Sequence, residues 1–291
     1  MALPLIVGAD GSDTGLRAVD WAVDEAVLHG LPLRLVYASR WERYEGALFA
    51  ESLGRPTEQV LADDIVATAA ERAHRRNADL EISIQVLADD PVTALLREGH
   101  YATALILGSR GRGDITGLML GSVSLSVAAR ATCPVIVVRG DKAGLAGTHE
   151  RILLGVGDPL KGTQAIRFAF REAQARGCVL DAVHAWRRPA HERAGHPLHT
   201  QEPESSHQER AAALLDEALA EAADAHPAVR VRRTPVEGPA HKVLVHRAAA
   251  ADLLVVGAQR HQGHLGLQLG RVAHTALHHA DCPVAVVPQP G

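Results

Sequence analysis

The sequence has few aromatic residues and few cysteines. Phe, Trp and Tyr make up 3% of the 291 residues, whereas hydrophobic residues of all kinds make up 47%, so the core must consist mainly of Val, Leu, Ile and Ala. The three cysteines are Cys133, Cys178 and Cys282, and no two of them are spaced as C-x-x-C. This odd count and this spacing argue against a disulfide framework or a zinc site. They favour small buried thiols.

Excess positive charge and long apolar runs are also absent. The formal net charge of −4 argues against a nucleic-acid binder that depends on bulk positive charge. No apolar stretch approaches the ~20 residues that a bilayer crossing needs. The opening residues MALPLIVGAD lack the basic region of a secretory signal. We therefore expect a cytoplasmic protein with no nucleic-acid partner and no membrane partner.

Two halves of the chain repeat each other. The segment LILGSRGRGDITGLMLGSVS at 105–124 aligns without gaps to LVVGAQRHQGHLGLQLGRVA at 254–273, and TCPVIVV at 132–138 recurs as DCPVAVV at 281–287. A fixed order of similar segments indicates two homologous domains.

The expected division lies near residue 146, with domains at 1–145 and 146–291. Residues 140–150 are polar and rich in glycine, so they are typical of a short linker.

Short β-branched runs alternate with helical patterns in the first repeat. Leu16, Val19, Val23 and Val27 recur at helical spacing and predict one amphipathic helix. The continuous apolar runs indicate strands that are covered on both faces, which is typical of a mainly parallel sheet in an α/β fold. We predict strands at 3–9, 31–38, 81–87, 104–108 and 134–138, and helices at 13–29, 57–77, 91–100 and 122–131.

A glycine-rich stretch, GSRGRGDITGLMLGS at 108–122, follows the fourth predicted strand. In open parallel sheets, ligands bind beyond the carboxyl ends of the strands. Gly108 and Gly111 would let the backbone turn tightly and approach a ligand. Gly121 and Ser122 precede a helix, whose N-terminus favours phosphate. The alternative is structural, because glycine loops are common after strands and a helix start needs a cap.

The spacing of this stretch, G-x2-G-x9-G-[ST], resembles the ATP-binding signature of the universal stress protein family. It is neither a Walker A loop nor a Rossmann fingerprint. The first strand ends in VGADGS, similar to the family's V-x-x-D-x-S, and each repeat closes with C-P-V before a β-branched run. The tandem arrangement resembles two-domain members from actinobacteria.

The resemblance implies two tandem open parallel sheets of five strands each, with strand order 3-2-1-4-5, helices on both faces and an adenine nucleotide alpha-hydrolase-like fold. It implies that Asp10 meets the nucleoside and that Ala38 lies near adenine. A carboxylate suits ribose hydroxyls, although Asp10 could instead form a turn or cap a helix. The expected ligand is ATP, with or without Mg²⁺, and no catalytic or metal-ligating residue is assigned. The expected ATP-binding residues are Ala9, Asp10, Gly11, Ala38, Gly108, Ser109, Arg110, Gly111, Arg112, Gly121, Ser122, Val123 and Ser124.

The second repeat departs from this pattern at three aligned positions. Asp10 aligns with Gly157, although Asp158 is adjacent, Gly111 aligns with Arg260, and Ser122 aligns with Arg271. We expect a degraded site that has lost the ribose acceptor and the open space for phosphate, so that each chain holds one nucleotide. A site for another anion, held by the two arginines, is the alternative.

Histidine is concentrated in the second half, which holds all but three of the 17. His274 and His278 are four residues apart on a predicted helix and could share one face as metal ligands. No acidic or Cys ligand accompanies them or the preceding His261 and His264 at a recognised spacing, so solvated or packing roles are favoured. Residues 187–207 have the composition of a mobile loop.

Two functions remain open. The favoured one is an ATP-binding regulatory module that acts in stress or dormancy and has a protein partner the sequence does not name. The alternative is a slow ATP-hydrolysing or phosphate-transferring enzyme, for which Asp114 and Ser124 are the nearby candidates, without a recognisable catalytic arrangement. A flavin or nicotinamide carrier lacks its fingerprint.

We also expect a homodimer through the apolar edge strand at 134–138 or at 283–287, as in the family. Pairing of these two strands inside one chain is the alternative.

Overall fold

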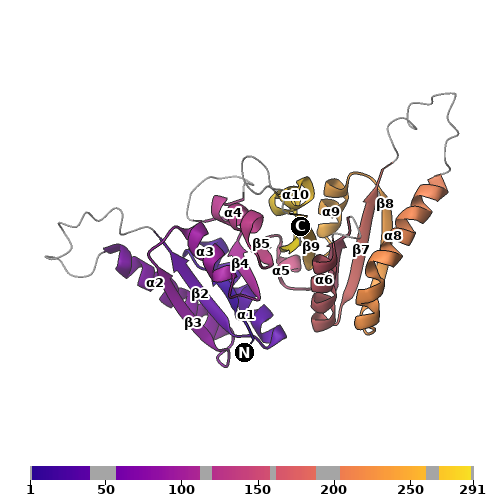
Figure 1. Ribbon diagram of the computed structural model, residues 1–291. Coiled ribbons are helices and arrows are strands. Elements are labelled where there is room, and N and C mark those ends of the chain that lie inside the picture. The colour runs from indigo at the N-terminus through magenta and orange to yellow at the C-terminus, as the bar shows by residue number, and fades with distance from the viewer. Residues whose placement is uncertain are drawn as a thin grey trace. The chain divides into compact units, whose positions relative to one another are not determined.

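The computed structural model describes residues 2–39, 57–111, 120–157, 162–187, 204–259 and 269–289. The chain divides into two compact units, Met1–Arg139 and Gly140–Gly291, and each is described by itself (Figure 1). Among the described residues, every helix falls short of the length or the apolar content that a membrane crossing requires.

The first unit is built on a five-stranded sheet. Its strands are β1 (Leu5–Gly8), β2 (Leu33–Ala38), β3 (Ile82–Leu87), β4 (Ala104–Gly108) and β5 (Val135–Val138). Their order is β3-β2-β1-β4-β5, and every pair is parallel. The predicted parallel α/β fold and its strand order are therefore confirmed.

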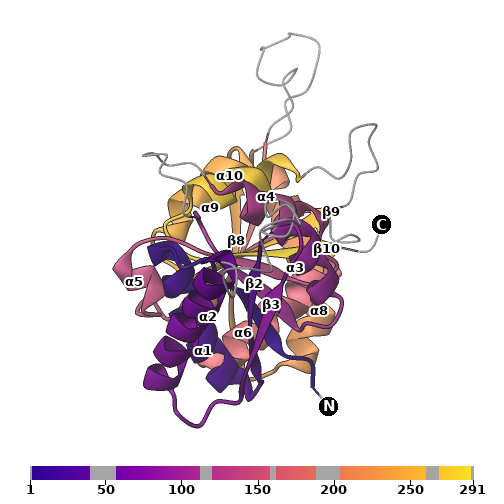
Figure 2. The same cartoon turned by 90° about the vertical axis from the view of Figure 1, so that its left-hand side faces the viewer.

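Two pairs of helices flank this sheet (Figure 2). α1 (Asp13–His29) packs with α2 (Thr57–Arg76), and α3 (Pro91–Gly99) packs with α4 (Ser122–Arg130). Because parallel crossovers are right-handed and the chain reverses direction across the sheet after β3, the two pairs cover opposite faces. The central strands are the most buried, with Ile6, Leu35 and Ile106 each at 0% exposure, whereas β3 at one end of the order is half-buried or exposed throughout.

The buried face of α1 differs from the expected one. Val19 and Val23 are buried as predicted, but Val27 is 48% exposed and Leu16 is only partly buried. Small side chains take their place against the sheet, so the apolar pattern was rotated by about one residue from the face that packs. The alanines on this face are Ala18, Ala22 and Ala26.

The second unit repeats the same order. Its parallel sheet runs β8-β7-β6-β9-β10. α6 packs with α8, and α9 packs with α10. The elements are α5 (Lys142–Leu145), β6 (Arg151–Gly155), α6 (Thr163–Arg176), β7 (Val179–Trp186), α8 (Glu204–Ala225), β8 (Arg230–Glu237), α9 (Ala240–Ala248), β9 (Leu253–Gln259), α10 (Arg271–His279) and β10 (Val284–Gln289).

The segment predicted as a linker contains the short helix α5. Asp141 caps it by accepting a bond from the Gly144 N–H at 2.9 Å, and the Asp141 N–H donates to the Asp281 carbonyl at 3.1 Å. Gly140 has a φ of 103°, and a Cβ there would lie 2.2 Å from the same carbonyl oxygen. This part of the segment is therefore packed into the second compact unit, which begins at Gly140.

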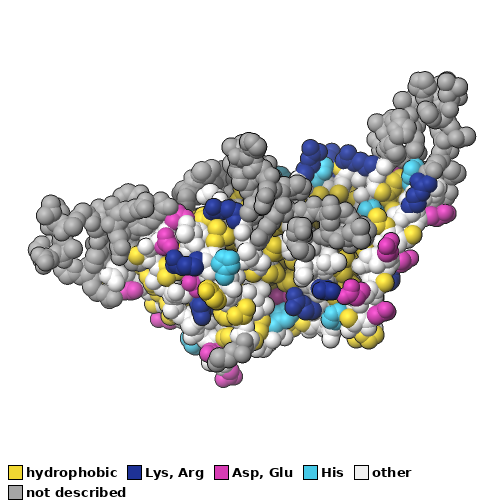
Figure 3. Space-filling view, in the orientation of Figure 1, with side chains coloured by type: hydrophobic (Ala, Val, Ile, Leu, Met, Phe, Trp, Pro, Cys, Tyr) yellow, Lys and Arg dark blue, Asp and Glu magenta, His cyan; other side chains and the backbone are white. Residues whose placement is uncertain are grey.

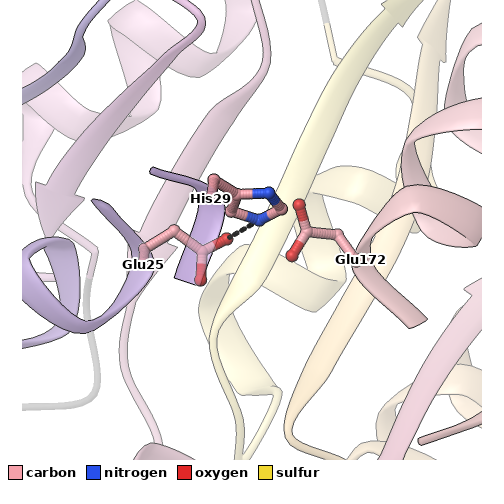
Figure 4. A group of neighbouring side chains, drawn as sticks. All are labelled: Glu25, His29 and Glu172. Carbon is pink, nitrogen blue, oxygen red and sulfur yellow. Dashed lines mark ion pairs between the residues drawn. The ribbon is translucent and has the colours of Figure 1, made fainter. Parts of the chain in front are cut away.

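The helix that follows the first strand of each unit, α1 or α6, ends in the same way. In α1, His29 lies 3.3 Å from Glu25, one turn earlier (Figure 4). In α6, Arg176 lies 3.3 Å from Glu172. A glycine in the left-handed conformation follows each helix, and a basic residue in the last turn interacts favourably with the helix dipole.

An ion pair between strand and helix also recurs, but with its charges exchanged. In the first unit, Arg34 of β2 lies 3.2 Å from Glu98 of α3. In the second unit, Asp181 of β7 lies 3.3 Å from Arg247 of α9. Both acids are almost fully buried, at 7% and 1% exposure.

Charged side chains of both signs share the surface. On the face drawn in Figure 3, Lys and Arg form several separate groups among acidic and apolar side chains, over the residues that the structure describes. The surface on this face is therefore mixed in charge.

Candidate functional site

A cavity of about 470 Å³ lies at the carboxyl ends of the strands in the first unit. Strand order reverses between β1 and β4, and such a switch point is where open α/β sheets bind ligands. The volume lies in the usual range for small-molecule sites, about 300–1,000 Å³. The lining residues are Gly8, Ala9, Asp10, Gly15, Val36, Ala38, Pro91, Leu95, Leu107, Gly108, Arg110, Gly111, Leu120, Gly121, Ser122, Val123 and Ser124.

Most of the predicted site residues line this cavity. Three do not: Arg112 lies outside the described residues, Ser109 is partly buried beside the cavity, and Gly11 is exposed. Gly11 has a φ of 75°, so the turn after β1 explains why glycine stands there. The ten that line it are Ala9, Asp10, Ala38, Gly108, Arg110, Gly111, Gly121, Ser122, Val123 and Ser124.

The carboxylate of Asp10 has one oxygen in a turn and one beside the cavity loop. Oδ1 accepts bonds from the Ser12 N–H at 3.0 Å and the Ser12 hydroxyl at 2.6 Å. Ser12, not Asp10, caps α1, by accepting the Gly15 N–H at 3.0 Å. A Cβ on Gly111 would lie 3.0 Å from Asp10 Oδ2. Asp10 therefore forms the turn and also presents Oδ2 to the cavity wall.

The start of α4 forms another wall. Its N-cap is Gly121, and no side chain caps the helix. Ser122 is the first helical residue and is exposed, so it does not serve as the cap. By contrast, Ser12 caps α1 and Asp90 caps α3. The N-cap residue of α4 therefore supplies no side-chain acceptor to the first N–H groups of the helix, and such a helix start favours an anion.

Three successive carbonyl groups at the start of the glycine loop are each hydrogen-bonded. The Gly108 carbonyl accepts from the Ser124 hydroxyl at 2.7 Å, and the Ser109 carbonyl accepts from the Gly121 N–H at 2.8 Å. The Arg110 carbonyl accepts from the Thr14 hydroxyl at 2.5 Å. The conformation of residues 108–110 is therefore fixed by α1 and α4.

Neither residue named as a candidate for phosphate chemistry gains support from the geometry. The Ser124 hydroxyl is buried and committed to the Gly108 carbonyl. Asp114 lies outside the described residues.

Gly108 is needed for a close approach of the backbone. Its φ is not among the positive values of the described glycines, so no left-handed conformation requires glycine there. Instead, a Cβ there would lie 2.8 Å from the backbone carbon and oxygen of Thr14 and 2.9 Å from the Gly15 nitrogen. Gly108 thus lets the first turn of α1 approach the end of β4.

Sequence reasoning missed Thr14 and Gly15. Both are buried in the first turn of α1, and a Cβ on Gly15 would lie 2.5 Å from Asp10 Oδ1. A glycine directly inside a helix start is costly, and this cost could have indicated a close approach. The apolar walls were also missed, because their residues are ordinary core types until the cavity is known. They include Val36, Leu95, Leu107 and Leu120.

The second unit has a smaller cavity, of about 290 Å³, at the same end of its sheet. Gly157 lines it where Asp10 lines the first, and Arg271, the first residue of α10, takes the place of Ser122. Asp158 and Arg260 lie outside the described residues. No carboxylate lines this cavity among the residues that the structure describes there.

Gln289, from the end of β10, fills part of that second site. Its side chain accepts the Gln164 N–H at 3.1 Å and donates to the Val287 carbonyl at 3.1 Å, and the residue is 4% exposed. A Cβ on Gly257 would lie 3.2 Å from Gln289 Nε2, whereas at the aligned Gly108 it would meet the backbone of α1. In the second unit the Gln289 side chain therefore lies between the end of β9 and the first turn of α6, whereas in the first unit the end of β4 contacts the first turn of α1 directly.

The histidine pair shares one helix face, as expected. The rings of His274 and His278 lie 4.5 Å apart at an interplanar angle of 30°. Within the described ranges, no third His, Cys, Asp or Glu joins them in a metal-ligating group. His261 and His264 lie outside the described residues, as do residues 188–203 of the predicted mobile loop.

All three cysteines are buried, as predicted. Burial raises the pKa of the Cys133 thiol to about 11 and also raises the pKa of Cys178. These thiols are therefore poor nucleophiles and ligands at neutral pH.

Comparison with known proteins decides the family. The model of the universal stress protein family matches residues 1–139 and again residues 148–288. The chain belongs to the universal stress protein family. A universal stress protein of Mycobacterium tuberculosis (strain ATCC 25618 / H37Rv) is 33% identical over 293 residues, covering 98% of this chain and 97% of the relative.

Solved structures of universal stress proteins agree with the fold. One from Archaeoglobus fulgidus covers 98% of both chains with a TM-score of 0.69 at 15% identity, a likeness that shows the fold alone. A universal stress protein in complex with cAMP is 28% identical over 47% of this chain and 98% of its own, with a TM-score of 0.37. This second likeness covers less than half of the chain.

Proposed function

We propose that the first unit binds ATP in its 470 Å³ cavity and that the chain is a nucleotide-responsive regulatory module in stress or dormancy adaptation. One observation carries the proposal: a single cavity at the switch point has the Asp10 carboxylate on one wall and the uncapped start of α4 on another. A nucleotide needs acceptors for its ribose hydroxyls and donors for its phosphates, and these two walls supply them.

In this proposal the adenine lies toward β2 and α3, where Val36, Ala38 and Leu95 provide an apolar lining. The ribose hydroxyls donate to Asp10 Oδ2. The phosphates lie at the start of α4 and at the backbone N–H of Gly111, because the side of Gly111 that a Cβ would occupy faces Asp10 Oδ2, which takes the ribose. Mg²⁺ is bound mainly through substrate phosphates and water, so it would enter with ATP without a protein cage of its own.

The second unit, in this proposal, holds no ATP. Its cavity is smaller, lacks a described carboxylate and contains the Gln289 side chain. Arg271 adds positive charge, but Arg cannot accept a bond from ribose. The expected stoichiometry is therefore one ATP per chain.

Calorimetric titration of the nucleotide-stripped full chain with ATP, with and without Mg²⁺, tests the proposal. Asp10→Asn keeps an acceptor for Ser12 at Oδ1 but replaces Oδ2 with a donor. Losing a bond to a charged acceptor costs about 1.5–3 kcal/mol, so affinity should fall by about 10- to 100-fold.

The matched control is Asp89→Asn. Asp89 is also a loop carboxylate that accepts a neighbouring backbone N–H, and it does not line the cavity. Its ATP affinity should be unchanged. No binding by the wild type, or two equivalent sites per chain, would contradict the proposal. Phosphate release measured in the same samples separates a binding module from a slow hydrolase.

We also propose that two chains associate through an outer strand, β5 or β10. Both strands are apolar at their start and carry no charged side chain, which would leave them free to pair with another chain. Sedimentation at several concentrations tests this, since a mass that stays at 30.9 kDa would exclude a dimer.

A further inference from the structure

We propose that Thr14 is a positioning residue for phosphate recognition, which acts through the carbonyl group of Arg110. The inference rests on the proposed function of the cavity, and it identifies how the shape of the glycine loop is held. Thr14 does not line the cavity itself.

The contact is partly buried and joins two segments that are far apart in the sequence. Thr14 is 7% exposed, and its hydroxyl donates to the Arg110 carbonyl at 2.5 Å, across 96 residues of sequence. Ser12 Oγ lies 3.2 Å from Thr14 Oγ1, so the helix cap and the loop belong to one hydrogen-bonded network. A buried hydroxyl with this partner locks the loop to α1.

The planarity of the peptide bond gives this contact its consequence. In a trans peptide the carbonyl of one residue and the N–H of the next point in opposite directions within one plane. Holding the Arg110 carbonyl toward Thr14 therefore directs the Gly111 N–H away from α1. The bonds to the Gly108 and Ser109 carbonyls fix the next two N–H groups, of Ser109 and Arg110, in the same way.

An anion-binding loop depends on such fixed N–H groups. Successive backbone N–H groups held in one arrangement attract anions, whereas a carbonyl that turns toward a phosphate repels it. Of the three carbonyl bonds, the Thr14 bond is the one nearest in sequence to Gly111, where the proposed phosphate site is open. The Ser12 hydroxyl also lies 3.5 Å from this carbonyl, a long contact beside the 2.5 Å bond of Thr14, so losing the Thr14 bond loosens the Arg110–Gly111 peptide.

Two features of the first unit make the contact possible. A Cβ on residue 108 would lie only 2.8 Å from the Thr14 backbone, so the glycine there makes room for that backbone. Ser12 caps the helical turn that carries Thr14. In the second repeat the residue aligned with Thr14 is Lys161, which has no hydroxyl. The bond is therefore a property of the first repeat.

The experiment compares Thr14→Val, which removes the hydroxyl with little change of shape, with Thr14→Ser, which keeps it. Full-length, nucleotide-stripped proteins are titrated with ATP and with adenosine. We expect Thr14→Val to weaken ATP binding about 10-fold, since small misplacements of binding groups carry such costs, and to leave adenosine binding within about twofold. Thr14→Ser should bind ATP like the wild type.

Thr103→Val is the matched control. The Thr103 hydroxyl also donates to a backbone carbonyl, that of Leu3, at 2.6 Å, and it lies outside the cavity lining. Its binding of both ligands should equal that of the wild type.

Each outcome bears on the inference. Unchanged ATP affinity in Thr14→Val would overturn it, and so would an equal loss for ATP and adenosine, because that pattern marks a general structural role. If Thr14→Val does not fold, Thr14→Ala is measured against Thr14→Ser by the same criteria. If the wild type binds ATP no more tightly than adenosine, this inference alone is overturned. If the wild type binds neither ligand, the proposed function is overturned as well.

Discussion

Exchanging the charges of the strand–helix ion pair in the first unit should reproduce the arrangement of the second. The two pairs occupy equivalent places, since Arg34 lies opposite Ile6 of β1 and Asp181 lies opposite Leu153 of β6. We therefore predict that Arg34→Asp and Glu98→Arg each destabilise the chain, and that the double variant recovers most of the loss.

The structure sets the expected size of this effect. Two unit charges 3.2 Å apart attract by about 5 kcal/mol at an effective dielectric constant of about 20. The Arg34 side chain is 33% exposed, and Glu98 must be desolvated, so both screening and desolvation reduce the net value. We expect each single variant to lose about 2 kcal/mol and the double variant to lose about 1 kcal/mol, so the coupling energy should be about 3 kcal/mol.

Urea denaturation of the four proteins in the double-mutant cycle measures this coupling. The control is the same exchange at Arg76 and Asp24, a 2.5 Å pair whose side chains are 44% and 53% exposed. There the coupling should be below about 0.5 kcal/mol. A coupling at Arg34 and Glu98 no larger than at the control pair would refute the argument that burial of the acid makes this pair matter.

Three further changes test other parts of the structure. In Gly108→Ala the new Cβ would lie 2.8 Å from the Thr14 backbone, so this variant should lose about 1–3 kcal/mol of stability and bind ATP more weakly. In Gly121→Ala the new Cβ would lie 3.5 Å from Arg110 Cα, so this variant should fold normally. Urea denaturation and calorimetry compare the two variants. Burial raises the pKa of the Cys133 thiol from 9.0 to about 11, so the folded state holds this proton more tightly than the unfolded state does. The stability that comes from this proton is therefore fully present below pH 9 and is lost as pH rises through 11. Stability measured from pH 8 to 11 should therefore fall more for the wild type than for Cys133→Ala. Gln289→Ala removes the acceptor of the Gln164 N–H and should cost about 1 kcal/mol without creating a second ATP site, so a second ATP bound in calorimetry would contradict the reading of the second unit.

The sequence predicted the sheet well because strands covered on both faces have an unambiguous pattern. β2 was expected at 31–38 and is found at Leu33–Ala38, and α1 was expected and found at 13–29. The second repeat has the same order of similar segments, so it supports the same fold. The packing face of α1 was harder to predict, because alanine contributes little to an apolar pattern yet packs most closely against a sheet.

The cavity was predicted from its polar and glycine residues and not from its walls. Asp10, Gly111 and Ser122 stand at positions where a motif identifies them, and all three line the cavity. Thr14 and Gln289 could not be found in this way, because each contacts residues far away in the sequence, across 96 and 125 positions. Such contacts exist only once the fold has brought the segments together.

The contact between Gln289 and the start of α6 has a consequence for the order of folding. The first unit is continuous in sequence up to Arg139, so it can fold by itself during synthesis, as N-terminal domains generally do. The Gln164 N–H gains its acceptor only when β10, 125 positions later in the sequence, has joined the sheet. Because contacts of such high sequence separation cost loop-closure entropy before they stabilise the fold, this part of the second unit should be among the last to form.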